Sequence, residues 1–543
     1  MKIKYFLIIT PLLIFSILIS SMFFMGFFKP HRVNQLIIGS IGDATYLNPV
    51  LAQDSASSDI NSFVFNGLLK YDRNLNIVGD LAESWEVKEG NKPVIIFHLK
   101  KGVLWQDGEK FTADDVRFTY ETIMNPKTNT VRRSDFEKVE RVEVPDPYTF
   151  IVYYKEPFAP GLQSWMIGII PKHILQGKDI NRASFNRNPI GTGPFIFQQW
   201  ISDEKITLKA NPNYFEGRPY LDGIVYRIIP ETSLMEIELL TGGIDYTGIY
   251  PYQYKRISHN PSLRVYKQLS HGYSYIGYNL KNPLFKDKRV RKAITLAINR
   301  EEMVKYILYG LGVVATGPFT PDMWYYNHAV HPLPYDPKKA KKLLAEAGFK
   351  DIDGDGILEK DGKPFSFTLI TNSGNDIRKD IGVMVQRYLK EVGIDVKLRL
   401  YEWSVFLTNW INSKNFDACI LGWSLSLDPD QYEIWHSSQI KSGFNFISYK
   451  NLEVDRLLEE GRRTFDKKKR EKIYKRFHKI INEDQPYTFL FVPESTPALN
   501  KKFFLVKKEE KGRKLLKPIK MEKAGLMVDI IKWYVPKENE LTP

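Results

Sequence analysis

Residues 421–438 read LGWSLSLDPDQYEIWHSS, and no other stretch of the chain is as informative. The first residues close an apolar run that is short enough to be a buried strand. Pro429 and the aspartates beside it must leave that strand, because proline removes a ladder donor and aspartate favours turns. Trp423 and Trp435 therefore bracket a bend. Such an arrangement can line a ligand cleft and requires no catalytic group.

The composition is that of an ordinary globular protein. The chain has 543 residues, 43% hydrophobic and 26% charged, which is enough for two or three domains with an extensive core. The formal net charge is +14, and one dense basic patch lies between Lys501 and Lys520. No nucleic-acid-binding motif accompanies the charge, so we expect no nucleic-acid partner and interpret the basic residues as a solvated face near a membrane.

The N-terminus is the second clear signal. From Tyr5 to Phe28 the chain is apolar apart from one threonine and three serines, which is long enough to cross a hydrocarbon core of about 30 Å. A cleavable signal peptide has small residues before the cut, whereas this segment ends in bulky phenylalanines. The sequence favours an uncleaved anchor over cleavage near Ser21. By the positive-inside rule, Lys2 and Lys4 indicate only weakly that the body of the protein is exported.

Motifs at matching spacing extend from about residue 36 to about residue 535. Eight segments resemble, in the same order, the family 5 extracellular solute-binding proteins, which are the peptide and nickel receptors of ABC importers. They are NGLLKYD (66–72), DLAESWEV (80–87), WQDGEKFTADDVRFTYE (105–121), NPIGTGPF (188–195), NPNYFEGRPYLDGI (211–224), FKDKRVRKAITLAINR (285–300), YDPKKAKKLLAEAGF (335–349) and the Trp423 stretch.

The resemblance implies an α/β, two-lobed fold of the periplasmic-binding-protein type II class, with an inserted smaller mixed domain, to which this chain adds an N-terminal transmembrane helix. Crossing strands would join the lobes around a hinged cleft. The predicted segments are an anchor (1–32), the first part of lobe 1 (33–80), the inserted domain (81–187), the second part of lobe 1 (188–285), lobe 2 (286–490) and a return to lobe 1 (491–543).

Local patterns predict several elements. Thr112 is placed to cap a helix over FTADDVRFTYETIM, and Asp336 to cap another that Gly348 ends. Residues 365–401 alternate strand, helix and strand, which predicts a βαβ-like unit and a mixed or parallel sheet. The segment VDIIKWYV around Trp533 is predicted to be a final strand in lobe 1.

Enzyme motifs fail on their context. GLGVVA (310–315) fits a relaxed dinucleotide pattern but follows a helix, and GYSYIG (272–277) has one residue too many for a nucleophile elbow. The nine histidines form no HExxH motif of the kind typical of a zinc site. We expect a binding protein and not an enzyme. The only cysteine, Cys419, excludes N-terminal lipid attachment and an internal disulfide, and its apolar surroundings predict a buried core residue.

One acidic loop is a candidate metal site, and no other cofactor is expected. DIDGDGILEKDG (351–362) spaces three aspartates at alternate positions before a glycine, as in a calcium loop. Its twelfth residue is Gly362, where an EF-hand has a bidentate glutamate, so an ordinary solvated hairpin turn is the alternative. The predicted ligands of a structural calcium are Asp351, Asp353, Asp355 and Glu359.

The resemblance also implies a ligand site. In similar peptide receptors the strand around the tryptophan makes backbone contacts with the peptide, an early segment contributes from the opposite lobe, and a crossover strand lies at the hinge. For each aromatic residue, packing in the core is the alternative. The residues so implied are Gly422, Trp423 and Ser424, then Asp43, Ala44 and Thr45, then Tyr273, Tyr275 and Asn279.

The charged residues at this site differ from those of the family that the chain resembles. Peptide receptors of this family carry an aspartate shortly after the tryptophan that pairs with the peptide's amino terminus, and Ser426 stands at that place. Because the chain is one residue shorter between Trp423 and Pro429, Asp428 is the alternative partner. An uncharged serine would not compensate a buried ammonium. Binding of free-amine peptides is therefore in doubt, and capped peptides or other extended solutes are open.

The sequence thus predicts a monomeric, membrane-tethered receptor that captures a peptide or a related extended solute and delivers it to an ABC permease. Closure of the lobes around the ligand would be its mechanism. An oligosaccharide or metal-chelate receptor is an alternative of the same class. A sensory or chaperone-like ectodomain is an alternative of another class, because fold does not determine function.

Overall fold

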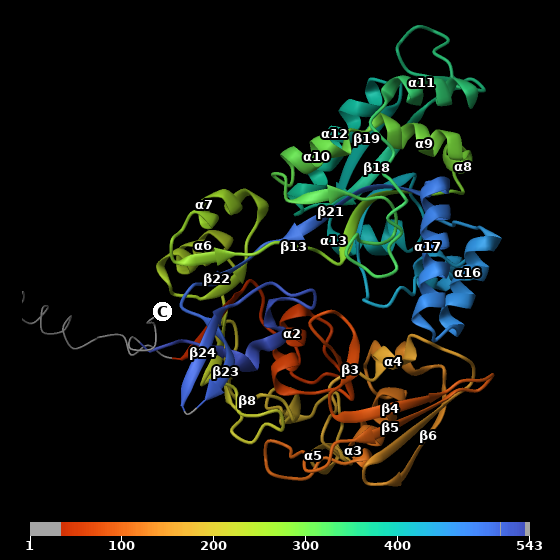
Figure 1. The fold of residues 1–543 in the computed structure, drawn as a ribbon. Helices are drawn as coiled ribbons and strands as arrows, with labels where there is room; N and C mark the ends of the chain where they lie inside the picture. The colour runs from red at the N-terminus through yellow and green to blue at the C-terminus, as the bar shows by residue number, and fades with distance from the viewer. Residues whose placement is uncertain (1–33, 511, 538–543) are drawn as a thin grey trace, which may run out of the picture.

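The computed structural model describes residues 34–510 and 512–537. The transmembrane helix predicted within residues 1–32 lies outside this part of the chain. Within it, no helix combines the length and the apolar character that a membrane span requires. The described chain forms two lobes, one above the other in Figure 1.

Lobe 1 is built on a seven-stranded mixed sheet in which β1 runs parallel to both of its neighbours. Helices α2 (Ser55–Val64), α6 (Thr232–Thr241) and α7 (Tyr254–Ser258) accompany it. The strand order is β12 (Leu263–Val265), β22 (Pro497–Asn500), β11 (Tyr246–Gly248), β1 (Gln35–Ser40), β10 (Gly223–Ile228), β9 (Lys205–Ala210) and β8 (Phe195–Ile201).

The inserted region holds a separate four-stranded antiparallel sheet of β4 (Ala82–Lys88), β5 (Val94–Leu99), β7 (Thr149–Tyr154) and β6 (Val139–Asp146). Helix α3 (Ala113–Met124) packs against it. Thr112 caps this helix as predicted, since the Asp115 carboxylate accepts the Thr112 N–H at 3.0 Å. The apolar residues of this sheet and of the lobe 1 sheet form one continuous core, which makes the insert part of lobe 1.

Lobe 2 is built on a second seven-stranded sheet. Its βαβ unit is confirmed, because α12 (Asp376–Lys390) connects two parallel strands. Asp336 caps α11 (Pro337–Glu346) and Gly348 adopts a φ of +94°, both as predicted. The strand order is β13 (Gln268–Leu269), β21 (Tyr487–Ser495), β14 (Gly272–Tyr278), β20 (Ala418–Ser424), β18 (Ser366–Asn372) and β19 (Asp395–Tyr401), with β15 (Gly312–Val314) on β21.

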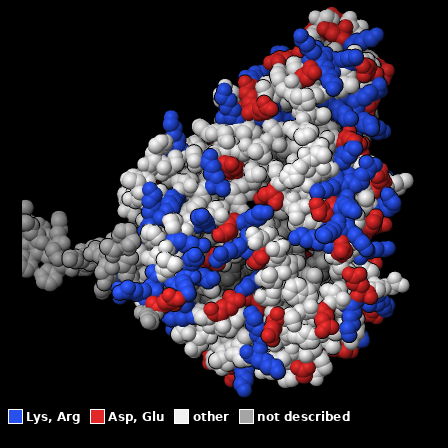
Figure 2. Space-filling model, in the orientation of Figure 1, with Lys and Arg blue, Asp and Glu red and all other residues white. Residues whose placement is uncertain are grey.

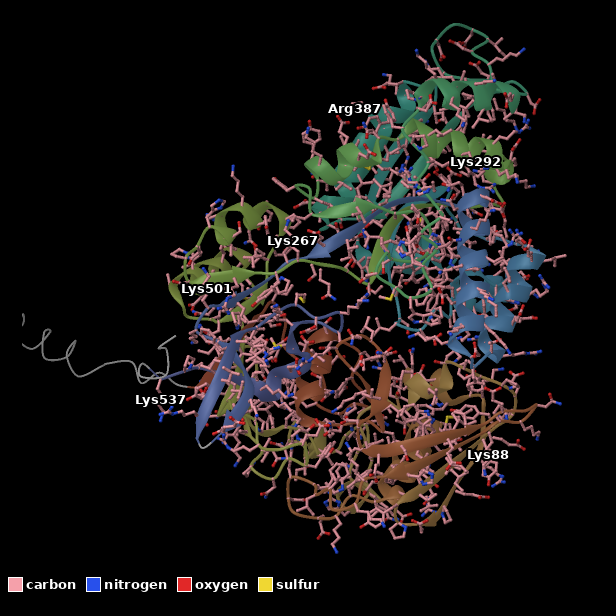
Figure 3. All side chains as sticks on the ribbon, in the orientation of Figure 1. Lys88, Lys267, Lys292, Arg387, Lys501 and Lys537 are labelled. Atoms are coloured by element: carbon pink, nitrogen blue, oxygen red, sulfur yellow. The ribbon has the colours of Figure 1, made fainter. Side chains whose placement is uncertain are left out.

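Two chain crossings join the lobes. One lies between β12 and β13, where Figure 3 labels Lys267, and the other is Thr496 between β21 and β22. The crossings are bonded to each other, because Tyr266 N–H donates to the Pro497 carbonyl at 2.9 Å and Ser270 N–H to that of Pro493 at 2.8 Å. They form a two-stranded hinge.

The hinge corrects the predicted boundary between lobes at residue 285. Strand β14 pairs with β20 and β21 and lies inside the sheet of lobe 2, so the chain crosses before residue 272. The return likewise comes after β21 and not at residue 491. The sequence places the boundary too late because an apolar strand such as residues 272–278 does not show from its sequence which sheet it joins.

The C-terminal region forms a small sheet of β24 (Arg513–Pro518), β23 (Phe504–Glu510) and β25 (Trp533–Tyr534). The prediction of a strand throughout VDIIKWYV is wrong, since most of it belongs to a 3-10 helix, Leu526–Lys532. Leu526 and Ile530 of this segment are buried, and the backbone kinks at Asp529 between them. Trp533 is fully buried in the core of lobe 1.

Lobe 2 encloses a neutral histidine. His478, on helix α17 (Lys467–Asp484), is fully buried. Its Nδ1 accepts the N–H of Asn327 at 3.3 Å, which leaves Nε2 as the protonated atom that donates to the Thr316 hydroxyl at 3.0 Å. Burial, with a smaller contribution from His328, lowers the pKa of His478 from 6.5 to about 3. The ring is therefore uncharged at neutral pH.

We predict that His478 makes lobe 2 sensitive to acid. Between pH 6.5 and about 3 the unfolded chain binds a proton at this histidine that the folded chain does not. Lowering the pH from 7 to 4.5 should therefore reduce the free energy of unfolding by about 2.7 kcal/mol through this group. Urea titrations at both pH values would show a smaller acid loss for His478→Gln than for the unchanged protein. The His259→Gln variant, at an exposed residue of lobe 1, is the control, and equal losses in all three proteins would contradict the prediction.

Candidate functional site

The predicted aromatic residues lie together on two paired strands of lobe 2. Tyr273 of β14 is opposite Trp423 of β20, and the Trp423 ring stacks on Tyr275 with centroids 6.3 Å apart. Tyr273 and Tyr275 are buried core residues, whereas Trp423 is partly exposed. Phe444, 56% exposed, meets Trp423 edge-on at 5.7 Å. Of the three predicted aromatics, only Trp423 offers a surface to a ligand.

The end of strand β20 has an open edge. Strand β18 pairs with β20 only at Ala418 and Cys419, while β14 pairs with it as far as Ser424. Leu425 N–H donates to the His271 carbonyl on the β14 side, so alternation turns the backbone groups of Gly422 and Ser424 toward the open side. Free N–H and C=O groups of this kind can pair with an extended chain.

Arg378 lies beside this open edge and was not among the predicted site residues. A Cβ built on Gly422 would lie 3.9 Å from its guanidinium. One of its nitrogens donates to the Asn372 side chain at 2.7 Å, and it makes no ion pair within the described part of the chain. Burial lowers the pKa of Arg378. The sequence signal was weak, because an arginine in the first turn of a helix is usually a surface residue.

Asp428, the alternative partner for the peptide's terminal ammonium group, is already paired with another residue. Both of its carboxylate oxygens accept hydrogen bonds from the Arg470 guanidinium at 2.8 Å, and both side chains are buried. Although burial opposes it, this carboxylate raises the pKa of Arg470. A ligand ammonium would have to compete with the guanidinium, so the geometry argues for a structural ion pair.

Ser426 lies at a seam where the lobes touch. Its hydroxyl donates to the Gln163 side chain of the inserted region at 3.2 Å. Nearby, Ala159 N–H donates to the Arg462 carbonyl of lobe 2 at 2.7 Å. A cavity of about 280 Å³ lies along the seam, lined from lobe 1 by Tyr71, Leu75, Asn76 and Ile77 and from lobe 2 by Trp324, Leu427 and Lys467.

The predicted lobe 1 segment is held by the start of helix α2. Thr45 donates through its hydroxyl to Asp54, the N-cap residue, and through its N–H to Ser57 at 2.9 Å. The Asp43 carboxylate accepts the Trp200 indole N–H at 3.1 Å, and Ala44 is buried. Asp43 is on the rim of a cavity of about 570 Å³ within lobe 1.

Asn279 has a structural environment. Its amide donates to the carbonyls of Lys414 and Phe416, at 3.1 and 2.9 Å, and it follows the end of β14 that is farther from Trp423. Of the predicted ligand residues, the structure therefore brings Gly422, Trp423 and Ser424 together at the open edge and leaves Asn279 apart from them. Cys419 is buried as predicted, and burial raises the pKa of its thiol to about 12.

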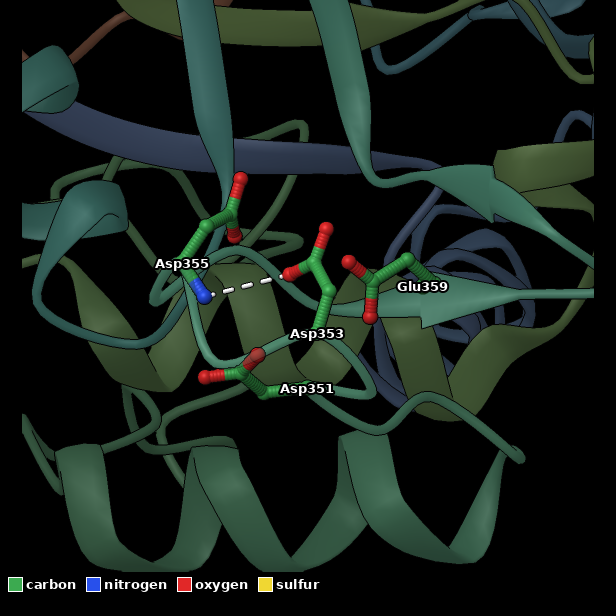
Figure 4. A group of neighbouring side chains, drawn as sticks. All are labelled: Asp351, Asp353, Asp355 and Glu359. Atoms are coloured by element: carbon green, nitrogen blue, oxygen red, sulfur yellow. Dashed lines mark hydrogen bonds between the residues drawn. The ribbon is translucent and has the colours of Figure 1, made fainter.

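The four predicted calcium ligands lie close together in one loop of lobe 2 (Figure 4). One ligand atom from each can be chosen so that all lie within 4.8 Å of one another. The carboxylates also accept hydrogen bonds from the loop's own backbone, for example Asp351 from Gly354 N–H at 2.8 Å and Glu359 from Ile352 N–H at 2.8 Å. The donor set suits calcium, and calcium binding remains a prediction.

Comparison with known proteins decides the family. Residues 76–444 match the model described as bacterial extracellular solute-binding proteins, family 5, middle. The chain belongs to this family. A curated relative, the oligopeptide-binding protein AppA of Bacillus subtilis, is 44% identical over 483 residues, covering 87% of this chain and 88% of the relative. The dipeptide-binding protein of Escherichia coli is 28% identical over 89% of this chain and 92% of its own length.

Solved structures of family 5 proteins share the two-lobed fold. AppA from Bacillus subtilis in complex with a nonapeptide aligns with a TM-score of 0.75 at 41% identity, covering 94% of this chain and all of that one. NikZ from Campylobacter jejuni, in complex with Ni(L-His), aligns with a TM-score of 0.76 at 30% identity, covering 92% and 99%. A protein solved with a nonapeptide and one solved with Ni(L-His) thus share one architecture with this family 5 protein.

We predict that Asp428 acts in stability. Asp428→Asn would leave the buried Arg470 guanidinium without its charge partner, at a cost of about 3–5 kcal/mol in the free energy of unfolding. Denaturant titration measures this. Ser426→Ala, two residues away at an exposed position, should change the stability by less than about 0.5 kcal/mol. Unchanged stability of Asp428→Asn together with lost ligand binding would instead make Asp428 a ligand contact.

For the acidic loop, we predict that calcium binds and stabilises lobe 2. Saturation at about 100 times the dissociation constant would add about 2.7 kcal/mol to the free energy of unfolding. Calorimetry with calcium, with magnesium and with a chelator would show the calcium effect. Glu359→Gln should abolish it, while Asp376→Asn, on an exposed residue outside the loop, should leave it unchanged. A melting temperature independent of calcium would identify the loop as an ordinary hairpin turn.

Proposed function

We propose that this family 5 protein is the substrate-binding receptor of an ABC importer and captures an extended peptide for a membrane permease. One observation carries the proposal: the open edge of β20 presents unpaired backbone groups between the partly exposed Trp423 and Arg378, which has no ion-pair partner among the described residues. A peptide can add to that edge as a short strand, with main-chain hydrogen bonds giving affinity in a manner independent of sequence. The peptide ligands named for AppA support this reading.

Each part of the edge has a proposed role. Gly422 and Ser424 bond the peptide backbone, and the absence of a side chain at Gly422 lets a second chain approach closely. Trp423 and Phe444 form an apolar wall for one peptide side chain. The Arg378 guanidinium, which has no ion-pair partner among the described residues, binds a carboxylate, either the peptide's C-terminus or an acidic side chain.

Capture would end in lobe closure about the hinge. Each lobe has its own hydrophobic core, so rotation at the hinge exposes neither. The seam at Ser426 and Ala159 holds one side of the cleft by a few hydrogen bonds, each worth about 0.5–1.5 kcal/mol, and by small contacts such as Leu75 against the lobe 2 core. Such a seam is weak enough to open, and a ligand that contacts both lobes stabilises the closed state. Asp43, Ala44 and Thr45 would meet it from lobe 1.

We further propose that the peptide's amino terminus is not held by a buried carboxylate. Ser426 is uncharged and Asp428 is bound to Arg470. A free ammonium would therefore remain hydrated, as in a long peptide whose ends emerge from the cleft. The protein should accept acetylated peptides as well as free ones. This separates it from receptors that recognise short peptides by both charged ends.

The proposed location is the outer face of the cell membrane. The apolar segment from Tyr5 to Phe28 would anchor the chain, and the body would act there as a monomer that docks onto the permease. The family is one of extracellular binding proteins, in keeping with an exported body and with binding in place of covalent chemistry.

Isothermal titration with one mixed-sequence nonapeptide tests the Arg378 assignment. Peptides with free or acetylated N-termini should bind within about threefold of each other, since no charge partner awaits the ammonium. Amidation of the C-terminus of a peptide without acidic side chains should weaken binding about tenfold or more. Arg378→Gln should remove that difference, and Arg387→Gln, an exposed arginine on the same helix, should preserve it. A large loss on acetylation would overturn the reading.

The same titration tests the wall. Trp423→Ala should weaken binding of every peptide by roughly tenfold or more, because it removes an aromatic contact at the centre of the edge. Tyr309→Ala, at a side chain that is 63% exposed and outside the edge, is the control. Unchanged affinity would place the ligand elsewhere.

A metal chelate is the second candidate, because the Arg378 guanidinium also suits the carboxylates of a complex such as Ni(L-His), the ligand named for NikZ. Titration with nickel and histidine together distinguishes the two. Binding of this complex in the absence of any measurable peptide binding would replace the peptide proposal.

A further inference from the structure

The C-terminal hairpin concentrates the positive charge of the chain. Residues 501–520, here called the basic hairpin, contain nine basic and two acidic residues, a balance of +7 within the chain's +14. Three lysines are neutralised within lobe 1: Lys502 by Asp245 at 2.6 Å, Lys514 by Glu509 at 3.9 Å and Lys508 by Glu510.

Further cations of the basic hairpin are exposed and have no carboxylate partner within the described residues. They are Lys507, Arg513 and Lys520. Figure 2 shows Lys and Arg side chains gathered at the end of lobe 1 where the described chain begins. The positive charge of this surface favours contact with an anionic partner outside the body of the protein.

The same hairpin exposes an apolar side chain. Leu515 of β24 is 56% exposed and lies opposite Lys508 of β23. Arg513, two residues before it, shares its face of the strand. An exposed leucine surrounded by cations suits the boundary between lipid headgroups and acyl chains, where the leucine leaves water and the cations meet phosphates. A purely aqueous polyanion would give the leucine no such environment.

The described chain begins next to the basic hairpin. The Asn34 side chain accepts Val535 N–H at 3.1 Å and donates to the Tyr220 carbonyl at 2.6 Å, and the Tyr220 hydroxyl donates to Glu509 of the hairpin at 2.9 Å. Strand β25, just before Val535, pairs with β23. The first described residue and the hairpin therefore belong to one edge of lobe 1 (Figure 1).

The sequence places a membrane anchor close to that edge. Only five residues, 29–33, separate the end of the apolar segment at Phe28 from Asn34. A fully extended chain covers at most about 3.6 Å per residue, so this connection reaches no farther than about 20 Å. Electrostatic attraction to a charged surface extends over a Debye length of about 8 Å at physiological salt. So short a connection holds lobe 1 near the membrane surface and lets the hairpin come within that distance of the headgroups.

We infer that the basic hairpin lies on anionic lipid headgroups, with Leu515 at the interface, and that this contact orients lobe 1 on the membrane. The inference rests on the proposed membrane anchor and adds to it a second, electrostatic attachment. It assigns to half of the chain's net charge a role that ligand binding does not use.

A fluorescent label at position 515 tests the contact in the full chain reconstituted into lipid nanodiscs. Leu515→Cys introduces one accessible thiol, because the native Cys419 is fully buried. Lipids carrying a nitroxide quencher near the headgroup report proximity. Quenching should be at least about twofold greater in discs containing phosphatidylglycerol than in phosphatidylcholine discs, and should fall as salt rises from 0.1 to 0.5 M.

Two variants of equal charge change provide the control. Lys507→Gln, Arg513→Gln and Lys520→Gln together should abolish the lipid-dependent quenching. Lys468→Gln, Lys469→Gln and Lys472→Gln on α17 of lobe 2 remove the same charge from another exposed face and should leave it unchanged. Equal loss in both variants would show a response to net charge and would overturn a specific contact.

Other outcomes overturn the inference in distinguishable ways. A chain that stays in the disc while its label is quenched equally in both lipids refutes the headgroup contact and leaves the anchor standing. Quenching only when permease is present would identify a protein partner instead. Release of the chain from the disc refutes the anchor and, with it, the orientation of lobe 1.

Discussion

The bonded pair of crossings between the lobes is the constraint on which the rest of the structure depends. The segments before β13 and after β21 are extended and joined by the hydrogen bond from Tyr266 N–H to the Pro497 carbonyl. Two such segments side by side can bend together, but sliding of one lobe past the other would break their backbone bonds. The permitted motion is rotation about one line, and each lobe can rotate as a body because its core is complete.

The open edge of β20 is rigid because paired strands connect it to this hinge. Strand β14 begins directly after the first crossing and pairs with β20 over its whole length, so Trp423 is fixed to the hinge through two strands of backbone hydrogen bonds. Beyond the strand, the buried pair of Asp428 and Arg470 ties the bend to helix α17. The open edge is therefore preorganised, and a ligand need not pay for ordering it.

Much of the fold was predictable because local patterns and family motifs agreed, as at the capped helices and in the βαβ unit. The predicted boundary at residue 285 and the predicted strand around Trp533 are wrong because strand pairing and burial decide these two features. Local sequence periodicity records neither of them. At the site, Trp423 was recognisable from the sequence as a large aromatic residue beside a proline-containing bend. Arg378 did not, since what distinguishes it is the missing partner, a property of three-dimensional surroundings. Asp428 looked available in sequence for the same reason: its partner Arg470 is 42 residues away.

Hinge and basic hairpin together impose an asymmetry on the two lobes. The hairpin and the first described residue both belong to lobe 1, whereas β20, Trp423 and Arg378 belong to lobe 2. If lobe 1 is held on the membrane, the rotation allowed by the hinge is carried by lobe 2, and it is the ligand edge that moves. Closure then brings a peptide already bound to lobe 2 against a stationary lobe 1. A permease below would meet one fixed and one moving surface, and the position of lobe 2 alone would signal that the receptor is loaded.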